Sequence, residues 1–279
     1  MKKLFGLFKL MRPLNLFQGA IAVLVTTTFF PQMPAWWQIL IGIGIVSCYS
    51  GAGNALNDFC DYQIDCINRP NRPLPAGLVK RSTALYFAII LFIVGSLLAI
   101  PVGSLGLFLI MALALVLLTT YSLIFKRLPF LGNFVVAAIL GMAFIFSATL
   151  FGDWRIGLPP AFLAFGFNLI REIVKDMQDV QGDEAVGART LPIKCGLKTA
   201  RSFVVGAIII LIIGTIIPYW TGIYGKYYLW AVLIAVNIPL LYAAVSIYHD
   251  YSSQNCGRLA RLLKGDVFFG LLAIYLGRF

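Results

Sequence analysis

The sequence predicts an all-α, polytopic membrane protein built as one bundle of about nine transmembrane helices. Three observations support this fold class: the composition, the long apolar runs and the placement of the basic residues. Of the 279 residues, 60% are hydrophobic and only 12% are charged, which is more apolar surface than one water-soluble core can bury. We therefore expect a single integral membrane domain over residues 1–279.

Apolar runs of about 20 residues, the length that crosses a bilayer, mark the expected spans. They fall at 13–31, 36–56, 83–101, 104–123, 129–151, 158–175, 203–220, 227–248 and 264–277. The first run follows a basic start, as in a signal peptide, but it is long and no small-residue cleavage site follows it, so we expect a retained span. The chain would form two four-helix pseudo-repeats, at about 1–127 and 128–250, plus a final helix.

The net charge of +11 comes mainly from basic residues at the ends of the expected helices on one side of the bundle. With the N-terminus and the loops after the even-numbered spans on that side, only Arg155, Lys226 and Arg278 fall on the other. The positive-inside rule makes the basic side cytoplasmic. This pattern predicts a multi-pass protein of the cell membrane, in contact with membrane lipids, and it argues against nucleic acid as a partner.

Two groups of aspartates stand out in a chain with 11 acidic residues. The first Asp row is Asp58, Asp61 and Asp65, and the second Asp row is Asp176, Asp179 and Asp183. Both rows have gaps of three and four residues, which place the side chains on one face of a helix. An even number of expected spans separates the rows, so both should lie at the cytoplasmic side, where they can meet.

Three stacked carboxylates repel one another, so each row calls for a cation. Hard oxygen ligands select Mg²⁺ or Ca²⁺ over softer metals. Because Mg²⁺ readily shares its coordination sphere with substrate phosphates, two facing Asp rows predict a clamp for a diphosphate. The alternative is a pair of solvated acidic helix ends, which the duplication of the whole triad does not favour.

Basic residues near the rows could neutralise phosphate oxygens that a metal leaves bare. Arg69 and Arg72 follow the first row in a proline-rich loop, although they could instead balance the local Asp charge or bind lipid headgroups. Lys126 lies at the cytoplasmic end of the fourth span, where ordinary anchoring explains it nearly as well. Beside the second row the candidates are Arg171, Lys175 and Arg189.

Three further polar residues have weaker signals. Tyr121, about one turn deeper than Lys126, could present its ring or hydroxyl to a developing cation, but tyrosine is also common at membrane interfaces. His249, in the polar stretch 248–258, is the only histidine and lacks partners for a metal site or a catalytic triad, so we expect a solvated loop residue. Asp266 follows Lys264 closely enough to form a local charge pair at a helix start.

Four segments together carry a resemblance to a known family. They are the motif NDxxDxxxD at 57–65, the Asn-Arg-Pro-Leu-Pro run at 71–75, the run at 126–133 and the second Asp row. The sequence is similar in these segments to the UbiA superfamily of intramembrane prenyltransferases, and the resemblance covers essentially the whole chain. It implies an isoprenoid diphosphate donor, Mg²⁺ held through both rows, and a cytoplasm-facing cavity that opens sideways to lipid.

The resemblance also implies roles for particular residues. The expected metal ligands are Asn57, Asp58, Asp61, Asp65, Asp176, Asp179 and Asp183. The expected catalytic residues are Asp61, Asp65, Asp179, Asp183 and Tyr121. The expected diphosphate-binding residues are Asn57, Arg69, Arg72, Lys126, Arg171, Lys175 and Arg189. Lys175 occupies the place of Asn57 in the second half, so the two halves are not identical, which suits one asymmetric donor.

The segments 171–183 and 187–192 look most like the branch of the superfamily that makes archaeal-type ether lipids. This likeness implies Mg²⁺-dependent transfer of a geranylgeranyl group from geranylgeranyl diphosphate to the free hydroxyl of the acceptor geranylgeranylglyceryl phosphate, with release of diphosphate. An aromatic acceptor of quinone biosynthesis, 4-hydroxybenzoate or a naphthoate, is the main alternative. A membrane transporter with an internal repeat is the other, although its site would be expected nearer the bilayer midplane.

Overall fold

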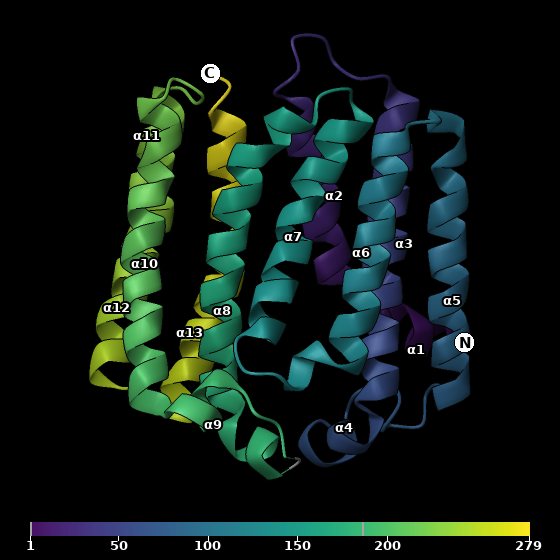
Figure 1. The fold of residues 1–279 in the computed structure, drawn as a ribbon, viewed down its shortest axis with the longest axis vertical. Helices are drawn as coiled ribbons and strands as arrows, with labels where there is room; N and C mark the ends of the chain where they lie inside the picture. The colour runs from purple at the N-terminus through teal and green to yellow at the C-terminus, as the bar shows by residue number, and fades with distance from the viewer. Residues whose placement is uncertain (1, 186) are drawn as a thin grey trace. The chain divides into compact units, whose positions relative to one another are not determined.

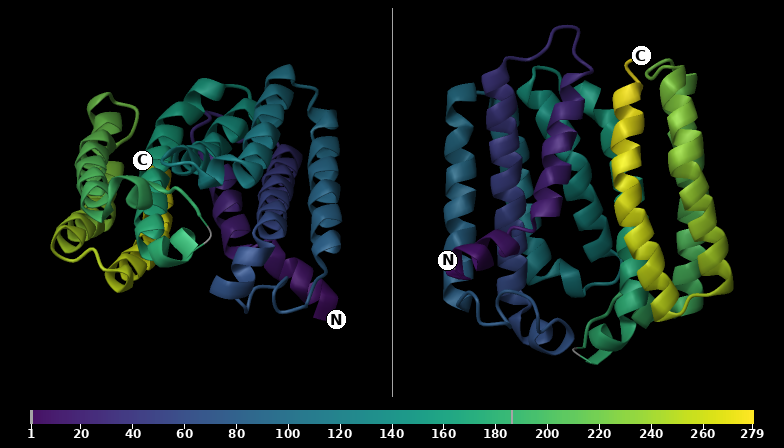
Figure 2. Two further views of the ribbon diagram at one scale, coloured as in Figure 1. Left: turned by 60° about the horizontal axis from the view of Figure 1, so that its bottom comes forward. Right: turned by 180° about the vertical axis from the view of Figure 1, so that it is seen from behind.

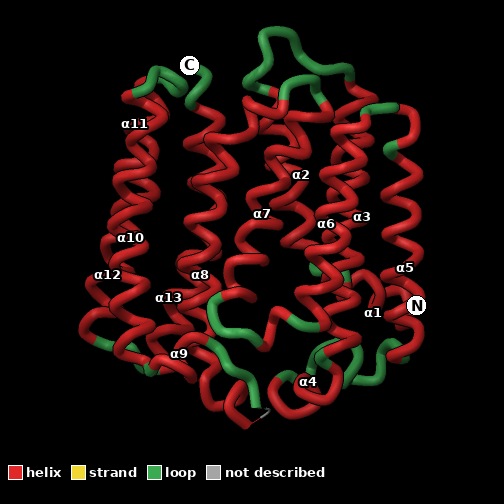
Figure 3. Tube along the Cα trace, in the orientation of Figure 1, coloured by secondary structure: helices red, strands yellow, loops and turns green. Residues whose placement is uncertain are grey.

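The computed structural model of the protein describes residues 2–185 and 187–279, which are arranged almost entirely in helices (Figure 1). Figure 3 shows no β-strand among the described residues, so the all-α prediction is confirmed. Contacts divide the chain into two compact units, and their boundaries are Met1–Ile124 with Ala143–Arg155, and Phe125–Met142 with Ile156–Phe279. The pseudo-repeats at about 1–127 and 128–250 stay a prediction.

The first unit contains α1 to α6, and the second contains α8 to α13. The bounds in the first unit are α1 Lys2–Leu10, α2 Pro13–Thr27, α3 Trp36–Cys60, α4 Tyr62–Asn68, α5 Arg81–Leu98 and α6 Leu105–Leu123. Helix α7, Leu131–Leu150, crosses from the second unit into the first. The bounds in the second unit are α8 Leu158–Ala185, α9 Leu191–Cys195, α10 Leu197–Trp220, α11 Lys226–Ala231, α12 Ile238–His249 and α13 Ser253–Leu276, with a π-helical stretch at Val232–Asn237.

Six helical segments of the described chain are long and apolar enough to cross a membrane, or seven if the bent pair α1 and α2 is one span. Most expected boundaries agree with the structure within a few residues. The 15 residues of α2 reach only about 22 Å, short of a bilayer core of about 30 Å. The runs at 158–175 and 264–277 lie in α8 and α13. These two helices carry several charged residues and are therefore not among the six segments that are apolar enough to cross a membrane. The number of nine spans therefore stays a prediction.

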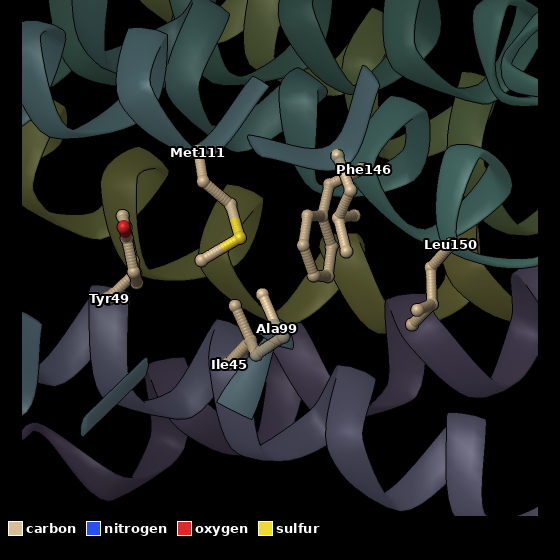
Figure 4. Close-up of a cluster of buried hydrophobic side chains, with 7 residues drawn as sticks. Ile45, Tyr49, Ala99, Met111, Phe146 and Leu150 are labelled. Carbon is tan, nitrogen blue, oxygen red and sulfur yellow. The ribbon is translucent and has the colours of Figure 1, made fainter. Parts of the chain in front are cut away.

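The first unit is organised around α3, which packs most extensively against α5 (Figure 1). Small residues let the two backbones approach: Ala55 and Ala88 are buried at this face, and a Cβ added at Gly95 would lie 2.9 Å from the Tyr49 ring. Figure 4 shows the apolar cluster beside it, which includes Tyr49, Met111 and Phe146. The Tyr49 hydroxyl pairs with Ser96 Oγ at 2.9 Å. This packing fixes α3, the helix that leads into the first Asp row.

The second unit is organised around α8, which packs against α13 and α10. Helix α13 runs antiparallel to α11 and α12 (Figure 2). At one end the carbonyl of Gly277 accepts from the backbone N–H of Gly225. At the other end Asn255 Nδ2 donates to Ser246 Oγ. The Ser252 hydroxyl caps the start of α13 by accepting from the backbone N–H of Asn255. This cap explains why α13 begins 11 residues before the apolar run at 264–277.

Two expectations about single residues have different outcomes. His249 is exposed and ends α12, where its ring meets Tyr248 edge-on at 5.4 Å, which fits the expected solvated position. The expected charge pair of Asp266 is wrong. Asp266 is 2% exposed in the interior of α13, and neither carboxylate oxygen has a hydrogen-bond partner. The helix starts well before Lys264, so Asp266 is not at a helix start.

Candidate active site

The first Asp row spans two helices, not one. Helix α3 ends at Cys60, Asp61 forms the junction with φ −86° and ψ 3°, and α4 carries Asp65. Backbone hydrogen bonds continue across the junction, from Asp61 N–H to Asn57 O at 2.9 Å and from Asp65 N–H to Asp61 O at 2.8 Å. All three aspartates are buried, with exposed fractions of 3 to 5%. The helical repeat is thus kept closely enough to bury the whole row.

Two arginines neutralise the first row. Arg72 Nη1 lies 2.6 Å from Asp65 Oδ2 and 3.3 Å from Asp58 Oδ1, so one guanidinium bridges the two ends of the row. Arg12 Nη2 lies 2.6 Å from the same Asp58 oxygen. Both arginines remain partly open to solvent, with side chains 20% and 33% exposed, whereas the Asp58 side chain is 4% exposed. The Asp charge is balanced locally, the alternative that the sequence left open for Arg72.

The position of Arg12 depends on an unusual backbone conformation. Arg12 has φ 55° and ψ 76°, in the left-handed region that a non-glycine residue adopts only at some energetic cost. It separates α1 from α2, which are bent by 51°, and Asn54 Nδ2 holds the adjacent Met11 O at 3.0 Å. The hydrogen bond from Asn54 therefore holds the junction between α1 and α2 against α3, one helical turn before Asp58.

Asn57 combines a support for Asp61 with an open oxygen. Its Nδ2 donates to Asp61 Oδ2 at 3.0 Å, which points the amide nitrogen at the carboxylate. Its Oδ1 is buried and has no hydrogen-bond partner within the described part of the chain. A buried amide oxygen without a donor is costly in isolation, and it is a suitable hard ligand for Mg²⁺.

The environment of Asp65 has opposing effects on its protonation. Burial raises the pKa of the Asp65 carboxyl above its ordinary value, while the Arg72 guanidinium works against this rise. The neighbouring carboxylates of Asp61 and Asp58 add a smaller increase in the same pKa. Arg72 therefore opposes the effect of burial and favours the ionised form of Asp65 in α4.

The second Asp row lies on a single helix, as the spacing predicts. Helix α8 runs without a break from Leu158 to Ala185 and carries all three aspartates. Asp176 Oδ2 accepts from Asn133 Nδ2 on α7 at 2.7 Å. One turn earlier, Glu172 is buried and contacts Arg171 Nη1 at 3.1 Å and Lys175 Nζ at 3.2 Å. Two of the basic residues expected at a diphosphate, Arg171 and Lys175, thus contact the Glu172 carboxylate.

The remaining expected site residues occupy different kinds of position. Tyr121 is half-buried in α6, and Lys126 is half-buried in the short helical turn Phe125–Arg127. Arg69 follows the last turn of α4 and donates its backbone N–H to Asp65 O at 2.9 Å. Arg189 is exposed in the connection between α8 and α9. The backbone of Arg69 is thus bonded directly to a residue of the first Asp row.

The donor atoms suit Mg²⁺, although the described residues contain no group of three or more His, Cys, Asp or Glu side chains placed to hold a metal ion. In the first row the carboxylate oxygens face arginine cations, and these contacts would have to be exchanged for metal contacts. The chemistry fits, because carboxylates and the open Asn57 Oδ1 are the hard oxygens that Mg²⁺ prefers.

The sequence analysis did not predict the contacts that four supporting residues make in the site: Arg12, Asn54, Arg81 and Asn133. Their partners lie 22 to 46 positions away in the chain, a separation over which helical spacing carries no information. Asn133 ends one of the segments that carried the family resemblance, and this is the only signal that could have marked it.

Comparisons with known proteins agree on the family. Residues 19–269 match the UbiA prenyltransferase family. A digeranylgeranylglyceryl phosphate synthase from Thermococcus gammatolerans is 35% identical over 255 residues, which is 91% of each chain. This similarity confirms the expected likeness to the ether-lipid branch.

Solved structures extend the similarity to the fold. One from a study of digeranylgeranylglyceryl phosphate synthase in membranes has a TM-score of 0.80 and 28% identity, covering 100% of this chain and 99% of that one. A UbiA homolog from Archaeoglobus fulgidus bound to GPP and Mg²⁺ has a TM-score of 0.69 at 14% identity, covering 96% and 99%. The chain is therefore a multi-pass membrane prenyltransferase that belongs to the UbiA prenyltransferase family.

Proposed function

We propose that this prenyltransferase transfers a geranylgeranyl group from geranylgeranyl diphosphate to the free hydroxyl of geranylgeranylglyceryl phosphate. The reaction breaks the allylic C–O bond to diphosphate, forms an ether bond to the glycerol oxygen, and releases diphosphate and the hydroxyl proton. The observation that carries the proposal is the 35% identity to a digeranylgeranylglyceryl phosphate synthase over 91% of both chains. The solved relative with 28% identity over the whole chain supports the same assignment.

The residues that we propose as Mg²⁺ ligands, in the first and second Asp rows, are Asn57, Asp58, Asp61, Asp65, Asp176, Asp179 and Asp183. When bound, Mg²⁺ supplies positive charge to the leaving diphosphate. The open Oδ1 of Asn57 supports this assignment, as does the use of Asp61 as the acceptor for its amide nitrogen. The A. fulgidus relative with GPP and Mg²⁺ indicates that such ligands are compatible with this fold.

The arginines that pair with the first Asp row could also bind the phosphate oxygens of the substrate. Arg72 bridges Asp58 and Asp65 while 20% of its side chain stays exposed, so its remaining N–H groups can reach a ligand from the solvent side. A guanidinium presents planar, paired donors to phosphate oxygens as well as to carboxylates. Once metal charge compensates the aspartates, Arg72 can hold the diphosphate. Arg69 lies at the end of the same short helix and is assigned to the same anion.

The second row would contribute through its own basic residues. Arg171 and Lys175 share the buried Glu172, which fixes their charged groups close to the turn that carries Asp176. Asn133 holds one Asp176 oxygen and leaves the other available. Lys126 and Arg189 are assigned to the diphosphate by sequence likeness. Donors held by neighbouring side chains need little reorganisation when charge develops on the leaving group.

The apolar helices would protect the reactive intermediate from water. Breaking the allylic bond leaves a carbocation that water would capture, and apolar walls exclude water from it. Tyr121, half-buried in α6, is proposed to offer its ring to this cation. We propose that the active site faces the cytoplasm, because basic residues flank both rows and the positive-inside rule favours that side for them.

The test is the mass of the product. The full chain in lipid nanodiscs is incubated with geranylgeranyl diphosphate, Mg²⁺ and either geranylgeranylglyceryl phosphate, 4-hydroxybenzoate or a naphthoate. We expect a product only with the glycerol phosphate acceptor, and none from an Asp61→Ala, Asp179→Ala double variant. Product from an aromatic acceptor alone would replace this proposal with the quinone-pathway alternative, and unchanged diphosphate release by the double variant would contradict the role of the rows.

A further inference from the structure

The junction between α3 and α4 divides the first Asp row. Asp58 is carried by α3, Asp65 by α4, and Asp61 is the residue between them. The relative position of the two outer carboxylates therefore depends on the angle between the helices. A change of a few degrees at Asp61 would separate oxygens that a metal must bind together, since Mg²⁺ demands near-ideal octahedral geometry.

Arg81, the first residue of α5, contacts both sides of this junction. Its Nε donates to the backbone carbonyl of Phe59, on α3, at 3.1 Å. Its guanidinium lies over the Phe59 ring at 4.5 Å and over the Tyr62 ring, on α4, at 5.9 Å. One side chain therefore connects the last turn of α3 to the first residue of α4.

The chemistry of the contact favours arginine. The carbonyl of Phe59 is one of the last four of α3, which lack the regular helical partner when the helix ends, and a cation there also complements the helix dipole. The planar guanidinium can donate in its plane while its face lies on aromatic rings. A lysine keeps the charge but cannot make both contacts in this way.

Helix α5, which begins with Arg81, is held in place by packing against α3. It packs on α3 through Ala55, Leu56 and Ala88, with Leu85 beside them. Tyr62 is itself held against a cluster of Leu10, Leu74, Val79 and Ala84. The two ends of the Arg81 contact are thus both parts of packed structure, which is what a fixed junction angle requires.

Arg72 also bridges the junction, from Asp58 to Asp65, but its contacts are the ones that metal and diphosphate would replace. The contacts of Arg81 within the described residues are with Phe59 and Tyr62 and not with an aspartate, so they are compatible with an occupied site. The second row needs no comparable residue, because α8 is continuous through all three of its aspartates.

We infer that Arg81 is a positioning residue that fixes the angle between α3 and α4 and thereby holds Asp58, Asp61 and Asp65 in metal-binding register. This inference rests on the proposed function for the identity of the ligand. Residues that orient metal ligands typically change metal affinity when they are replaced, without touching the metal.

The test compares Arg81→Ala and Arg81→Lys with Lys80→Ala, a matched control. Lys80 is the neighbouring basic residue, it is exposed, and its side chain makes no capping hydrogen bond. Mg²⁺ binding is measured by calorimetry on the full chain in nanodiscs without substrates. We expect affinity to fall about tenfold in Arg81→Ala, less in Arg81→Lys, and not at all in Lys80→Ala.

Two further readouts separate positioning from general destabilisation. Hydrogen exchange of the amides of Asp65 and Arg69, which close the turns of α4, should become faster in Arg81→Ala, while exchange in α8 stays as in the wild type. In the prenyl transfer assay the Mg²⁺ half-saturation should rise, with kcat recovering at high Mg²⁺.

The outcomes for the two proposals are distinct. Unchanged Mg²⁺ affinity and unchanged α4 exchange in both Arg81 variants would overturn the inference and leave the proposed function standing. If the wild type binds Mg²⁺ but forms no ether product, the proposed function fails, and the calorimetry still decides the role of Arg81. If Arg81→Ala does not fold, the test uses Arg81→Lys alone. A wild-type Mg²⁺ affinity in folded Arg81→Lys would then contradict the inference that the planar guanidinium of Arg81 fixes the junction.

Discussion

Asn133 on α7 donates a 2.7 Å hydrogen bond to Asp176 on α8, across 43 positions of the chain. Both residues belong to the second unit, and Asn133 is 6% exposed. The bond leaves Asp176 with one oxygen held and one available. Asn133 therefore has the same role in the second row as Asn57 has in the first: its amide nitrogen donates a hydrogen bond that orients an aspartate carboxylate.

Replacing Asn133 by alanine should lower kcat/KM for prenyl transfer about tenfold or more, because Asp176 loses the donor that orients it. Replacing it by aspartate should be worse, since two buried carboxylates would then repel each other. Steady-state kinetics with the full chain measures both. Asn168→Ala is the control, because Asn168 bonds only to the carbonyl of Ala164 in its own helix. Equal losses in Asn133→Ala and Asn168→Ala would argue against a specific role.

Replacing Asn57 by leucine should weaken Mg²⁺ binding about 10- to 100-fold. The substitution removes the open Oδ1 and also the donor to Asp61 Oδ2. Calorimetric titration with Mg²⁺ gives the affinity directly. Asn54→Leu is the comparison, since Asn54 lies one turn earlier in α3 but bonds to the backbone of Met11. A Mg²⁺ affinity that falls more in Asn54→Leu than in Asn57→Leu would contradict the ligand role of Asn57.

Removing divalent metal with EDTA should abolish prenyl transfer and leave the fold intact. The reason is that Arg12 and Arg72 already pair with Asp58 and Asp65, so two of the three carboxylates in the first row have a cation beside them without metal. Activity and circular dichroism of the same sample, before and after EDTA and again after added Mg²⁺, measure this. Loss of helical signal in parallel with activity would show that the arginines do not suffice.

Replacing Asp266 by leucine should stabilise the protein. Both Asp266 oxygens are buried without partners, and such a group costs about 1–3 kcal/mol. The antiparallel contacts of Gly225 with Gly277 and of Ser246 with Asn255 place Asp266 beside the π-helical stretch Val232–Asn237, in a part of α13 that carries none of the proposed site residues. Thermal unfolding should therefore shift to higher temperature while prenyl transfer is retained.

The control for Asp266 is Asp250, which is exposed and accepts the backbone N–H of Ser252 at 2.9 Å. Leucine at position 250 removes a satisfied hydrogen bond and should give no gain in thermal stability. A decrease in stability in Asp266→Leu would mean that the carboxyl has a partner in solution, such as an ordered water.

Much of the fold follows from local chemistry. Apolar runs of bilayer length predict the bounds of α6 and α7 to within two residues, because each helix satisfies its own backbone and needs only to match the membrane. The duplicated spacing of three and four residues likewise predicts two acidic rows, and the second lies on one helix as expected. These features are periodic, so they can be read from neighbours in sequence.

Other features are decided by contacts between distant segments. The break at Asp61, the left-handed turn at Arg12 and the burial of Asp266 leave no local signal, and each depends on what packs against it. The roles of Arg12, Arg81 and Asn133 exist only because folding brings them to partners 22 to 46 residues away.

The sequence by itself therefore determined the helical membrane fold, the family and the acidic rows, since these depend on composition and on periods of a few residues. Only the tertiary structure decided which cations and amides hold each carboxylate. A side chain's partner is chosen by the geometry of packed helices, and residues that are neighbours in space across a bundle share no period in the chain.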